Sequence, residues 1–229
     1  MVIFTKEVKP ETGYNIDMGI RIRLLKHRLY ADIAHYNMFL RNLLVTKRIS
    51  EDIFTGENAG KTNHQGIEIL VKYSVLPEGS ELQPAVDFSL SITESINRFK
   101  SFTDTAGNYS GKRLPGIPSG VINFNTFISL PRAWRFYINY QFFGSQYLTD
   151  DNSRKYNSYK LIGLKAQYDK PLFRNYNLSL FAGVQNLMNE KYASMVLVNA
   201  LPTGTSSPRY YYPGNPRNFY AGVKFQFGR

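Results

Sequence analysis

Apolar and polar side chains alternate along much of this chain with a period of two residues. In residues 218–227, apolar side chains occupy every second position from Phe219 to Phe227. The positions between them hold Tyr220, Gly222, Lys224 and Gln226. Successive side chains of a strand point to opposite faces, so this pattern predicts a β-strand with one apolar and one polar face. The same pattern recurs in residues 14–25, 67–75, 86–93, 134–142 and 176–184.

The connections between these segments alternate in length. Short turns are expected near residues 27, 78, 131 and 174, and longer polar loops near residues 55, 110, 153 and 205. The first of the longer loops is predicted to span residues 46–63. The series amounts to about nine strands. Short turns at one rim and long loops at the other are typical of outer-membrane barrels, in which the short turns are periplasmic. We therefore predict an all-β, antiparallel transmembrane β-barrel.

A soluble β-sandwich is the main structural alternative. Strands of soluble domains average about five or six residues, whereas the alternating segments here run to about ten or more. No stretch reaches the roughly 18 consecutive apolar residues of a membrane-spanning helix. The strand length and the asymmetry of the loops favour the membrane barrel over the sandwich.

The composition excludes several kinds of functional site. The chain has no cysteine, which excludes disulfides, thiolate metal sites and cysteine nucleophiles. Its three histidines include no pair with the spacing of metal ligands on a helix. A Ser-His-acid site around His64 is conceivable, but no Gly-x-Ser-x-Gly motif accompanies it. We therefore expect no enzyme, no metal site and no cofactor.

The formal net charge is +11. Lysines and arginines lie singly on polar strand faces or in loops and form no dense stripe with base-stacking aromatics, so nucleic-acid binding is not expected. A surplus of positive charge in loops and lumen favours anionic solutes or the phosphates of lipopolysaccharide. Simple solvation of the polar face explains the charge equally well.

Several motifs follow one another along the chain. Residues 183–192 read Gly-Val-Gln-Asn-Leu-Met-Asn-Glu-Lys-Tyr, and residues 208–217 read Pro-Arg-Tyr-Tyr-Tyr-Pro-Gly-Asn-Pro-Arg. Earlier segments are Lys-Pro-Glu at residues 9–11, Gly-Ile-Glu at residues 66–68 and Gly-Lys-Arg-Leu-Pro-Gly-Ile-Pro at residues 111–118. In their order along the chain, these segments resemble segments of TonB-dependent outer-membrane receptors, most closely those of Bacteroidota-type bacteria.

The resemblance implies that residues 1–229 are the C-terminal part of a barrel of about 22 strands. The N-terminal strands, the plug and the segment that contacts the inner-membrane TonB complex are absent from the sequence, which also starts without an export signal. An open sheet leaves unpaired edges that hydrocarbon cannot satisfy. We therefore expect a fragment that does not transport alone.

The family further implies energy-coupled uptake of a scarce solute. A small anionic metal chelate, such as a ferric siderophore or another iron complex, is the expected cargo, with cobalamin and then carbohydrate as alternatives. A stand-alone small barrel acting as a porin, an adhesin or a structural protein is a competing interpretation. A soluble β binding module is another.

Two sets of residues are candidates for function. Loop aromatics and basic residues that stack on and pair with anionic chelates form the ligand set. They are Tyr109, Lys112, Arg113, Arg154, Tyr156, Arg209, Tyr210 and Tyr211. The residues predicted to face lipid are Ile138, Leu180, Val223, Phe225 and Phe227. Trp134 and Tyr210 to Tyr212 are alternatively interfacial girdle residues. Asn186 and Asn189 are expected to hold a strand end by side-chain to backbone hydrogen bonds.

Overall fold

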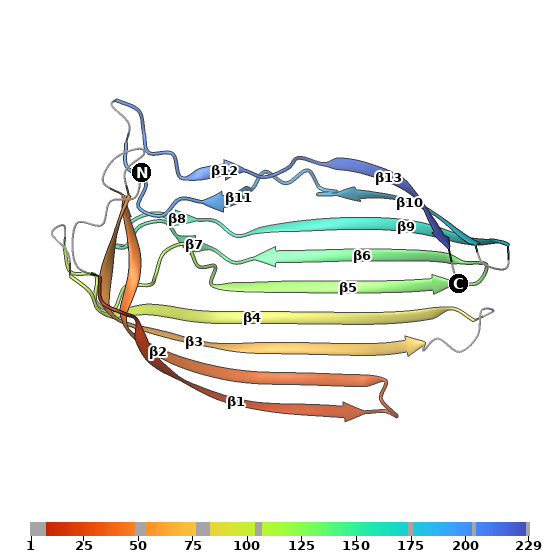
Figure 1. The fold of residues 1–229 in the computed structure, drawn as a ribbon, viewed down its shortest axis with the longest axis horizontal. Helices are drawn as coiled ribbons and strands as arrows, with labels where there is room; N and C mark the ends of the chain where they lie inside the picture. Colours follow the sequence, from red (N-terminus) through yellow and green to blue (C-terminus); the bar gives the residue numbers. More distant parts are fainter. Residues whose placement is uncertain are drawn as a thin grey trace.

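The computed structural model describes residues 8–48, 54–76, 83–103, 107–173, 176–202 and 205–227. Nine of its strands form one antiparallel sheet in the order β1-β2-β3-β4-β5-β6-β9-β10-β13 (Figure 1). Their bounds are β1 (Thr12–Leu24), β2 (Leu29–Arg48), β3 (Phe54–Leu76), β4 (Ala85–Ser101), β5 (Gly120–Leu130), β6 (Trp134–Phe143), β9 (Tyr159–Phe173), β10 (Tyr176–Gln185) and β13 (Asn218–Phe227). Among the described residues no helix is long and apolar enough to cross a membrane.

Short turns were predicted at one end of the strands and long loops at the other, and this difference is confirmed. At the right-hand edge of Figure 1, β1 turns into β2 through residues 25–28 and β5 into β6 through residues 131–133. Leu25, Lys26, His27, Arg132 and Ala133 have positive φ in these two turns. The expected turns near residues 78 and 174 lie outside the described residues. The long connections all lie at the opposite edge, which we call the long-loop edge (Figure 1).

The strand register separates an apolar face from a polar face. Directly paired residues share a face, and one such row crosses the sheet through Leu130, Trp134, Tyr168, Leu180 and Val223. The adjacent row on the other face runs through Ser129, Arg135, Gln167, Phe181 and Gly222. The alternation in the sequence therefore continues across neighbouring strands, as a two-sided sheet requires.

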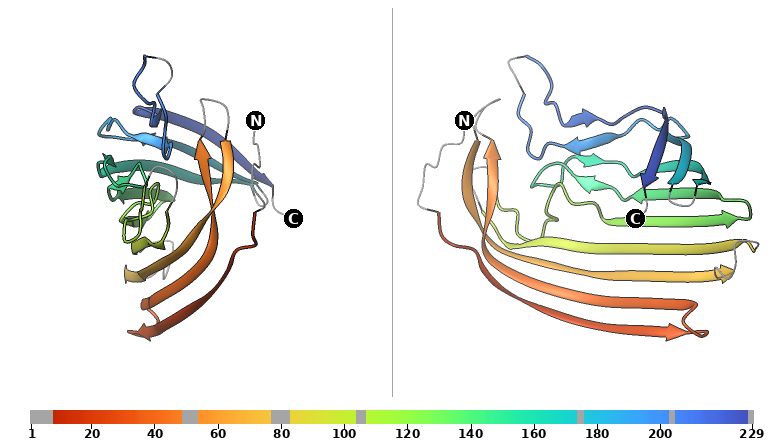
Figure 2. Two further views of the ribbon diagram at one scale, coloured as in Figure 1. Left: turned by 90° about the vertical axis from the view of Figure 1, so that its left-hand side faces the viewer. Right: turned by 45° about the vertical axis from the view of Figure 1, so that its right-hand side comes forward.

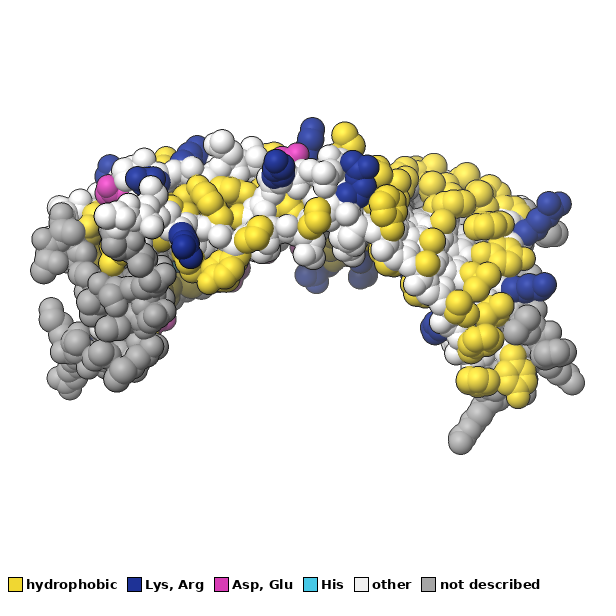
Figure 3. Space-filling model, turned by 90° about the horizontal axis from the view of Figure 1, so that it is seen from above, with side chains coloured by type: hydrophobic (Ala, Val, Ile, Leu, Met, Phe, Trp, Pro, Cys, Tyr) yellow, Lys and Arg dark blue, Asp and Glu magenta, His cyan; other side chains and the backbone are white. Residues whose placement is uncertain are grey.

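The sheet is bent into an open arch and does not close on itself. Figure 2 (left) shows it as a C-shaped wall with β1 at one end and β13 at the other. In the right-hand limb of Figure 3, hydrophobic side chains gather on the outer side of the arch. Surface hollows are lined mainly by residues of the polar face, which identifies that face as the concave one.

The loop predicted for residues 46–63 is wrong. The chain there continues as a long hairpin, in which β2 and β3 stay paired as far as Arg48 and Phe54. Gly56, Asn58 and Gly60 look like loop residues in the sequence, yet they lie within β3. Backbone pairing with the end of β2 overrides their low strand propensity, which is a context-dependent quantity. The hairpin extends beyond the ends of β5 and β6 at the long-loop edge (Figure 1).

Close packing is concentrated under the loops. Phe99, Phe102 and Leu114 form one buried cluster, with Leu43, Val45 and Tyr109 packed against it. Leu148, Ala200 and Tyr210 form a second cluster, with Tyr156, Val196 and Leu197 packed against it. A single sheet has no facing layer to bury its apolar side, so the buried side chains collect where loops fold over its edge.

Two small hairpins build these loops. β7 (Gln146–Tyr147) pairs with β8 (Lys155–Tyr156), and β11 (Ala193–Val196) pairs with β12 (Tyr211–Pro213). Polar loops were predicted in both regions, and these short pairings were not predicted. Its prediction for Asn186 and Asn189 is confirmed. Asn186 exchanges hydrogen bonds with the backbone of Glu190 at 2.8 and 2.9 Å, and Asn189 Oδ1 accepts one from the Arg217 N–H at 2.9 Å.

Candidate functional site

Four of the predicted ligand residues meet in one aromatic cluster at the long-loop edge. The Arg154 guanidinium lies over the ring of Tyr210, 5.4 Å from its centroid. The rings of Tyr156 and Tyr211 are 5.2 Å apart, and those of Tyr210 and Tyr211 are 6.2 Å apart. The cluster joins the β7–β8 region to β12 and to Tyr210, the residue before β12. We call Arg154, Tyr156, Tyr210 and Tyr211 the rim cluster.

The backbone around the rim cluster holds it in place. The Leu197 N–H donates to the Tyr210 carbonyl at 2.8 Å, and the Asn199 N–H donates to the Leu148 carbonyl at 2.8 Å. The Tyr156 hydroxyl accepts a hydrogen bond from the Ala193 N–H at 2.6 Å. These bonds tie segments far apart in the sequence into one packed unit that carries the aromatic side chains.

Members of the rim cluster differ in their access to solvent. Tyr210 is only 7% exposed, whereas Tyr211 is 52% exposed. Arg154 is exposed even though its guanidinium lies over the Tyr210 ring. Tyr210 therefore supports the arginine from below, and Arg154 and Tyr211 are the members that can touch a solute.

The loop with Tyr109, Lys112 and Arg113 joins the same edge. Tyr109 packs on Phe102 with ring centroids 5.5 Å apart, so its ring serves the buried cluster beneath the loop. Lys112 is exposed. The Arg113 guanidinium donates to the Ser95 carbonyl of β4 at 3.3 Å. Of these three residues, Lys112 is the one with a charge that is open to solvent.

Asn152 connects the two groups of candidates. Its side-chain oxygen accepts a hydrogen bond from the Arg113 N–H at 2.8 Å, and its side-chain nitrogen donates to the Arg113 carbonyl at 2.8 Å. A paired donor and acceptor on one amide mimic a step of strand pairing. Asn152 was not predicted as a functional residue, because a lone asparagine in a polar loop gives no indication of a partner so distant in the sequence. Arg209 is exposed and lies one residue before Tyr210.

An acidic group lies beside these cations. Hydrogen bonds from Thr149, and from the N–H and hydroxyl of Ser153, lower the pKa of the Asp151 carboxyl, and the nearby charge of Lys112 adds to the effect. Ser153 donates to Asp151 Oδ1 at 3.0 Å from its N–H and 2.8 Å from its hydroxyl. The carboxylate is thus held in its charged form and stabilises the loop that carries Arg154.

The concave wall below the rim carries a polar lining. The side chain of Asn139 donates to Asn125 Oδ1 at 2.8 Å, and the Tyr137 hydroxyl donates to the same oxygen at 2.7 Å. Gln141 donates to Asn123 Oδ1 at 3.1 Å. Amide side chains paired across strands satisfy one another and still offer free donors to the lumen. The alternation in residues 134–142 predicted Asn139 and Gln141 on the polar face and gave them no specific role.

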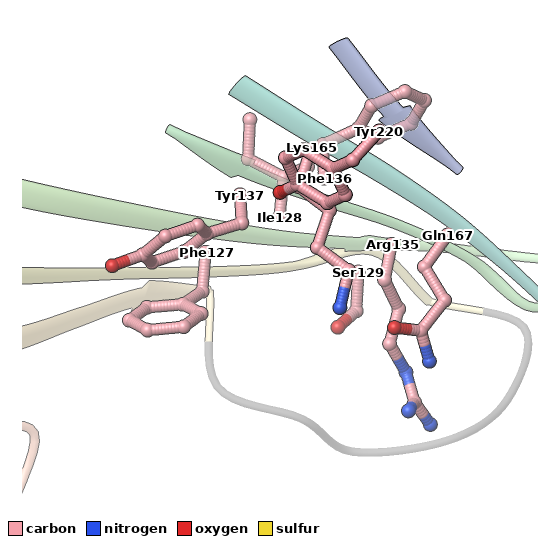
Figure 4. Close-up of a pocket in the computed structure, with 9 residues that line it drawn as sticks. All are labelled: Phe127, Ile128, Ser129, Arg135, Phe136, Tyr137, Lys165, Gln167 and Tyr220. Carbon is pink, nitrogen blue, oxygen red and sulfur yellow. The ribbon is translucent and has the colours of Figure 1, made fainter. Parts of the chain in front are cut away.

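A hollow of about 440 Å³ lies near the short-turn end of the concave wall. Its lining includes Phe127, Tyr137, Lys165 and Tyr220, with Arg135 and Gln167 side by side and pointing the same way (Figure 4). Arg135 forms an ion pair with Asp169 at 3.1 Å. The hollow thus combines aromatic rings with basic groups. This combination favours contact with an anionic or polar surface.

A second hollow, of about 450 Å³, lies nearer the long-loop edge and is lined by Asp17, Tyr36, His64, Glu68 and other residues. His64 Nδ1 lies 3.0 Å from Asn97 Oδ1, and its Nε2 lies 3.0 Å from Thr62 Oγ1. Both ring nitrogens therefore have neutral partners. Within the described residues, no group of three His, Asp or Glu is placed to hold a metal ion.

All five residues predicted to face lipid share the apolar face. Leu180 is directly opposite Val223, and Phe225 is opposite Leu178. Ile138 lies in the row that continues through Leu164 and Val184 to Phe219. Their exposed fractions run from 36% for Ile138 to 74% for Phe227. A contiguous exposed apolar surface of this kind needs a partner other than water.

Comparison with known proteins identifies the family. The family model described as "TonB dependent receptor-like, beta-barrel" matches residues 3–187. The chain belongs to this family. The match covers four of the five motif segments in full or in part, and the last strand lies beyond it. The resemblance read from the sequence is thereby confirmed.

Solved structures of TonB-dependent receptors share the fold. The ferric-catecholate import receptor Fiu from E. coli K12 is 18% identical with a TM-score of 0.66, over 95% of this chain and 28% of that one. The ferric yersiniabactin uptake receptor FyuA from Yersinia pestis is 16% identical with a TM-score of 0.66, over 95% and 30%. The copper transporter OprC is 18% identical with a TM-score of 0.68, over 96% and 32%. The chain spans about a third of these proteins or less.

Proposed function

We propose that this chain is the C-terminal part of the barrel of an outer-membrane TonB-dependent receptor that takes up a ferric siderophore or another iron complex. The observation that carries the proposal is the curved, open sheet with an apolar convex face and a polar concave face. An apolar outside and a polar inside are what a membrane barrel with a solute pathway requires.

The position within the barrel rests on the closing strand. β13 pairs with β10 along one edge only, and its ladder runs from Asn218 to Phe227. β1 likewise pairs only with β2. In hydrocarbon both free edges need partners. Strands that precede residue 1 in a longer protein would supply them and close the barrel, and a plug would fill the lumen.

The rim cluster supports an anionic cargo. Arg154 and Lys112 are exposed cations, and Tyr211 offers an exposed ring beside Arg154. Arginine binds carboxylate and catecholate oxygens through directed, charge-assisted hydrogen bonds, and aromatic rings stack on flat chelators. Two of the similar structures are named for ferric chelates, which favours iron as the metal.

Uptake by the complete receptor tests this function. Cells that lack the gene are complemented with it, and accumulation of ⁵⁵Fe is measured with a panel of ferric siderophores, with and without an intact TonB complex. We expect accumulation that requires both the gene and TonB. Uptake of the same chelates by cells without the gene, at the same rate, would contradict the assignment.

Copper is the second candidate cargo, because a copper transporter is among the similar structures. The same cells are therefore assayed with ⁶⁴Cu and with labelled cobalamin. TonB-dependent uptake of either solute in place of iron would keep the family and change the cargo. Diffusion of small solutes without TonB would favour a stand-alone porin.

A further inference from the structure

A third hollow, of about 230 Å³, lies on the concave face toward the long-loop edge. None of the described residues that line it is charged. The two hollows described above differ in this respect, because one contains Arg135 and Lys165 and the other Asp17 and Glu68. Most of the lining consists of side-chain amides, which are those of Asn139, Gln141, Gln185, Asn186, Asn215 and Asn218. We call this site the amide hollow.

A glycine provides the space in the amide hollow. Gly163 of β9 is paired directly with Asn139 of β6, and Gln185 lies on β10, the next strand of the sheet. A Cβ atom at Gly163 would meet its nearest atom, the Val184 carbonyl oxygen, at 3.6 Å. The floor of the hollow is thus bare backbone with open space above it, and amide side chains lie on either side.

Several of these amides have hydrogen-bonding groups to spare. Asn139 and Gln141 each donate to an asparagine of β5 and keep their own side-chain oxygens as acceptors. Within the part of the chain that the structure describes, no hydrogen bond is found for the side chain of Gln185 or Asn215, and both residues are exposed. Since each amide carries two N–H donors and one acceptor oxygen, the hollow offers both kinds of group to a ligand.

Tyrosine rings connect the rim cluster to the amide hollow. The ring centroid of Tyr156 lies 5.2 Å from that of Tyr211 and 6.0 Å from that of Tyr159. The Tyr159 ring in turn stacks on Tyr192, which lines the hollow, with centroids 5.1 Å apart. Gly214 lies against the Tyr192 ring, because a Cβ there would come within 2.5 Å of it. Aromatic surface therefore continues from the rim to the hollow.

A sugar ring matches this chemistry. Its hydroxyl groups both donate and accept hydrogen bonds, as the free amides do, and it brings no charge into a lining that has no ion-pair partner for one. The volume is below the roughly 300–1,000 Å³ of pockets for drug-sized ligands, which favours a single ring. An extended peptide also pairs with amides, but its alternate side chains need a series of pockets, and the bare floor at Gly163 is one recess.

We propose that the amide hollow binds one uncharged pyranose ring, carried either by a free saccharide or by a metal chelate with a sugar substituent. The side chains of Gln185 and Asn215 hydrogen-bond its hydroxyl groups, and Gly163 gives the ring room. In a sugar-bearing chelate, the cations of the rim cluster take the anionic part and the amide hollow takes the neutral part. The inference rests on the proposed receptor only in that the concave face is the solute side, and it is independent of iron.

Sugar binding to the complete receptor tests the proposal. The receptor is purified in a detergent without a sugar headgroup, and the affinities of the methyl glycosides of glucose, galactose and mannose are measured by saturation-transfer NMR. The variant Q185L removes an amide, and G163V fills the recess. The matched control is Q226L, because Gln226 is an exposed glutamine on the same face that lies at the short-turn end of β13.

We expect at least one methyl glycoside to bind the unchanged receptor and Q226L alike. Q185L and G163V are expected to weaken that binding by about tenfold, since an amide that both donates and accepts makes two hydrogen bonds. Absence of binding by all three glycosides would overturn the proposal, as would equal affinity in Q185L. Tighter binding of trialanine at the same site would assign the hollow to peptides and overturn it as well.

Two further probes distinguish the sources of the sugar. If a ferric catecholate with a glucosyl substituent binds more tightly than the plain chelate, and Q185L removes the difference, the ring belongs to a chelate. If maltotriose binds more tightly than the methyl glycosides and Q185L weakens it, the ring belongs to a free saccharide. Heat-modifiable migration on gels confirms that each variant is folded. Failed iron uptake would contradict the proposed function and leave these binding results unaffected.

Discussion

The ring of Tyr220 in β13 lies directly over Gly183 in β10. A Cβ atom at Gly183 would come within 2.5 Å of both Cζ and Oη of Tyr220 and within 2.7 Å of the Leu164 carbonyl oxygen. The two residues are paired in the register and lie on the concave face. The missing side chain lets the tyrosine ring lie flat against the wall next to the hollow that Tyr220 lines.

Gly183→Ala is therefore expected to destabilise the receptor by about 1–3 kcal/mol, the usual cost of overpacking. The free energy of unfolding by urea measures the effect in the complete protein. Gly163→Ala is the matched control, because a Cβ there meets its nearest atom, the Val184 carbonyl oxygen, at 3.6 Å. A loss of the same size in both variants would show that the Tyr220 contact is not the cause.

The apolar face yields a second prediction. Val223→Arg or Leu180→Arg is expected to cost roughly 2–4 kcal/mol if these residues lie at mid-bilayer. Gln141→Arg on the polar face is expected to change the free energy of unfolding little, because an arginine there reaches water. Refolding into phospholipid vesicles followed by denaturant titration measures both. Equal costs on the two faces would refute the membrane placement.

Asn152 gives a third prediction, about how the loops hold together. Asn152→Ala removes both hydrogen bonds to the Arg113 backbone. We expect faster amide exchange at Arg113, since a partly buried N–H loses its acceptor. Asn108→Ala is the control, because the hydrogen bond that the Asn108 side chain accepts within the described residues comes from the N–H of exposed Ser110. Hydrogen exchange with mass spectrometry resolves the two, and unchanged exchange at Arg113 in Asn152→Ala would contradict the link.

How far the sequence predicted this structure depends on the kind of residue. The alternation around Val223 and Leu180 specified the strands and their faces, because a period of two is imposed on every residue of a two-sided sheet. The hairpin beyond Val45 was mistaken for a loop, since pairing there depends on a partner strand and not on local propensity. The contact of Arg154 with Tyr210 could not be predicted from the sequence either, because packing between loops that are distant in the sequence has no periodic pattern. Asp32 and Arg21 fall between these cases: their strands were predicted, but their ion pair needed the register.

The pH dependence of the rim follows from Asp151. Its pKa is lowered in the folded protein, so the carboxylate stabilises the folded loop fully at pH values above the unfolded pKa of about 3.9. This contribution is lost as the pH falls through the lowered folded pKa. Protection of the Ser153 amide, measured from pH 7 downward, is expected to fall in that acidic window. In Asp151→Asn the protection is expected to be lower at pH 7 and to lack this acidic step. A step of equal size in the variant would point to another group.

Cargo recognition gives the final prediction. Arg154 is exposed and supported from below by Tyr210, so its charge is available to an anionic chelate without a loss of side-chain order. Arg154→Gln is expected to raise the chelate concentration needed for half-maximal binding by about tenfold or more, the usual loss for a charged hydrogen bond. Arg132→Gln, at the short-turn edge, serves as the control because Arg132 is also exposed but lies at the far end of the wall. Fluorescence titration of the complete receptor, with whichever ferric chelate the uptake assay identifies as cargo, measures both variants. Equal affinity in Arg154→Gln and the unchanged receptor would remove Arg154 from the binding site and leave Lys112 and Tyr211 as the next residues to test.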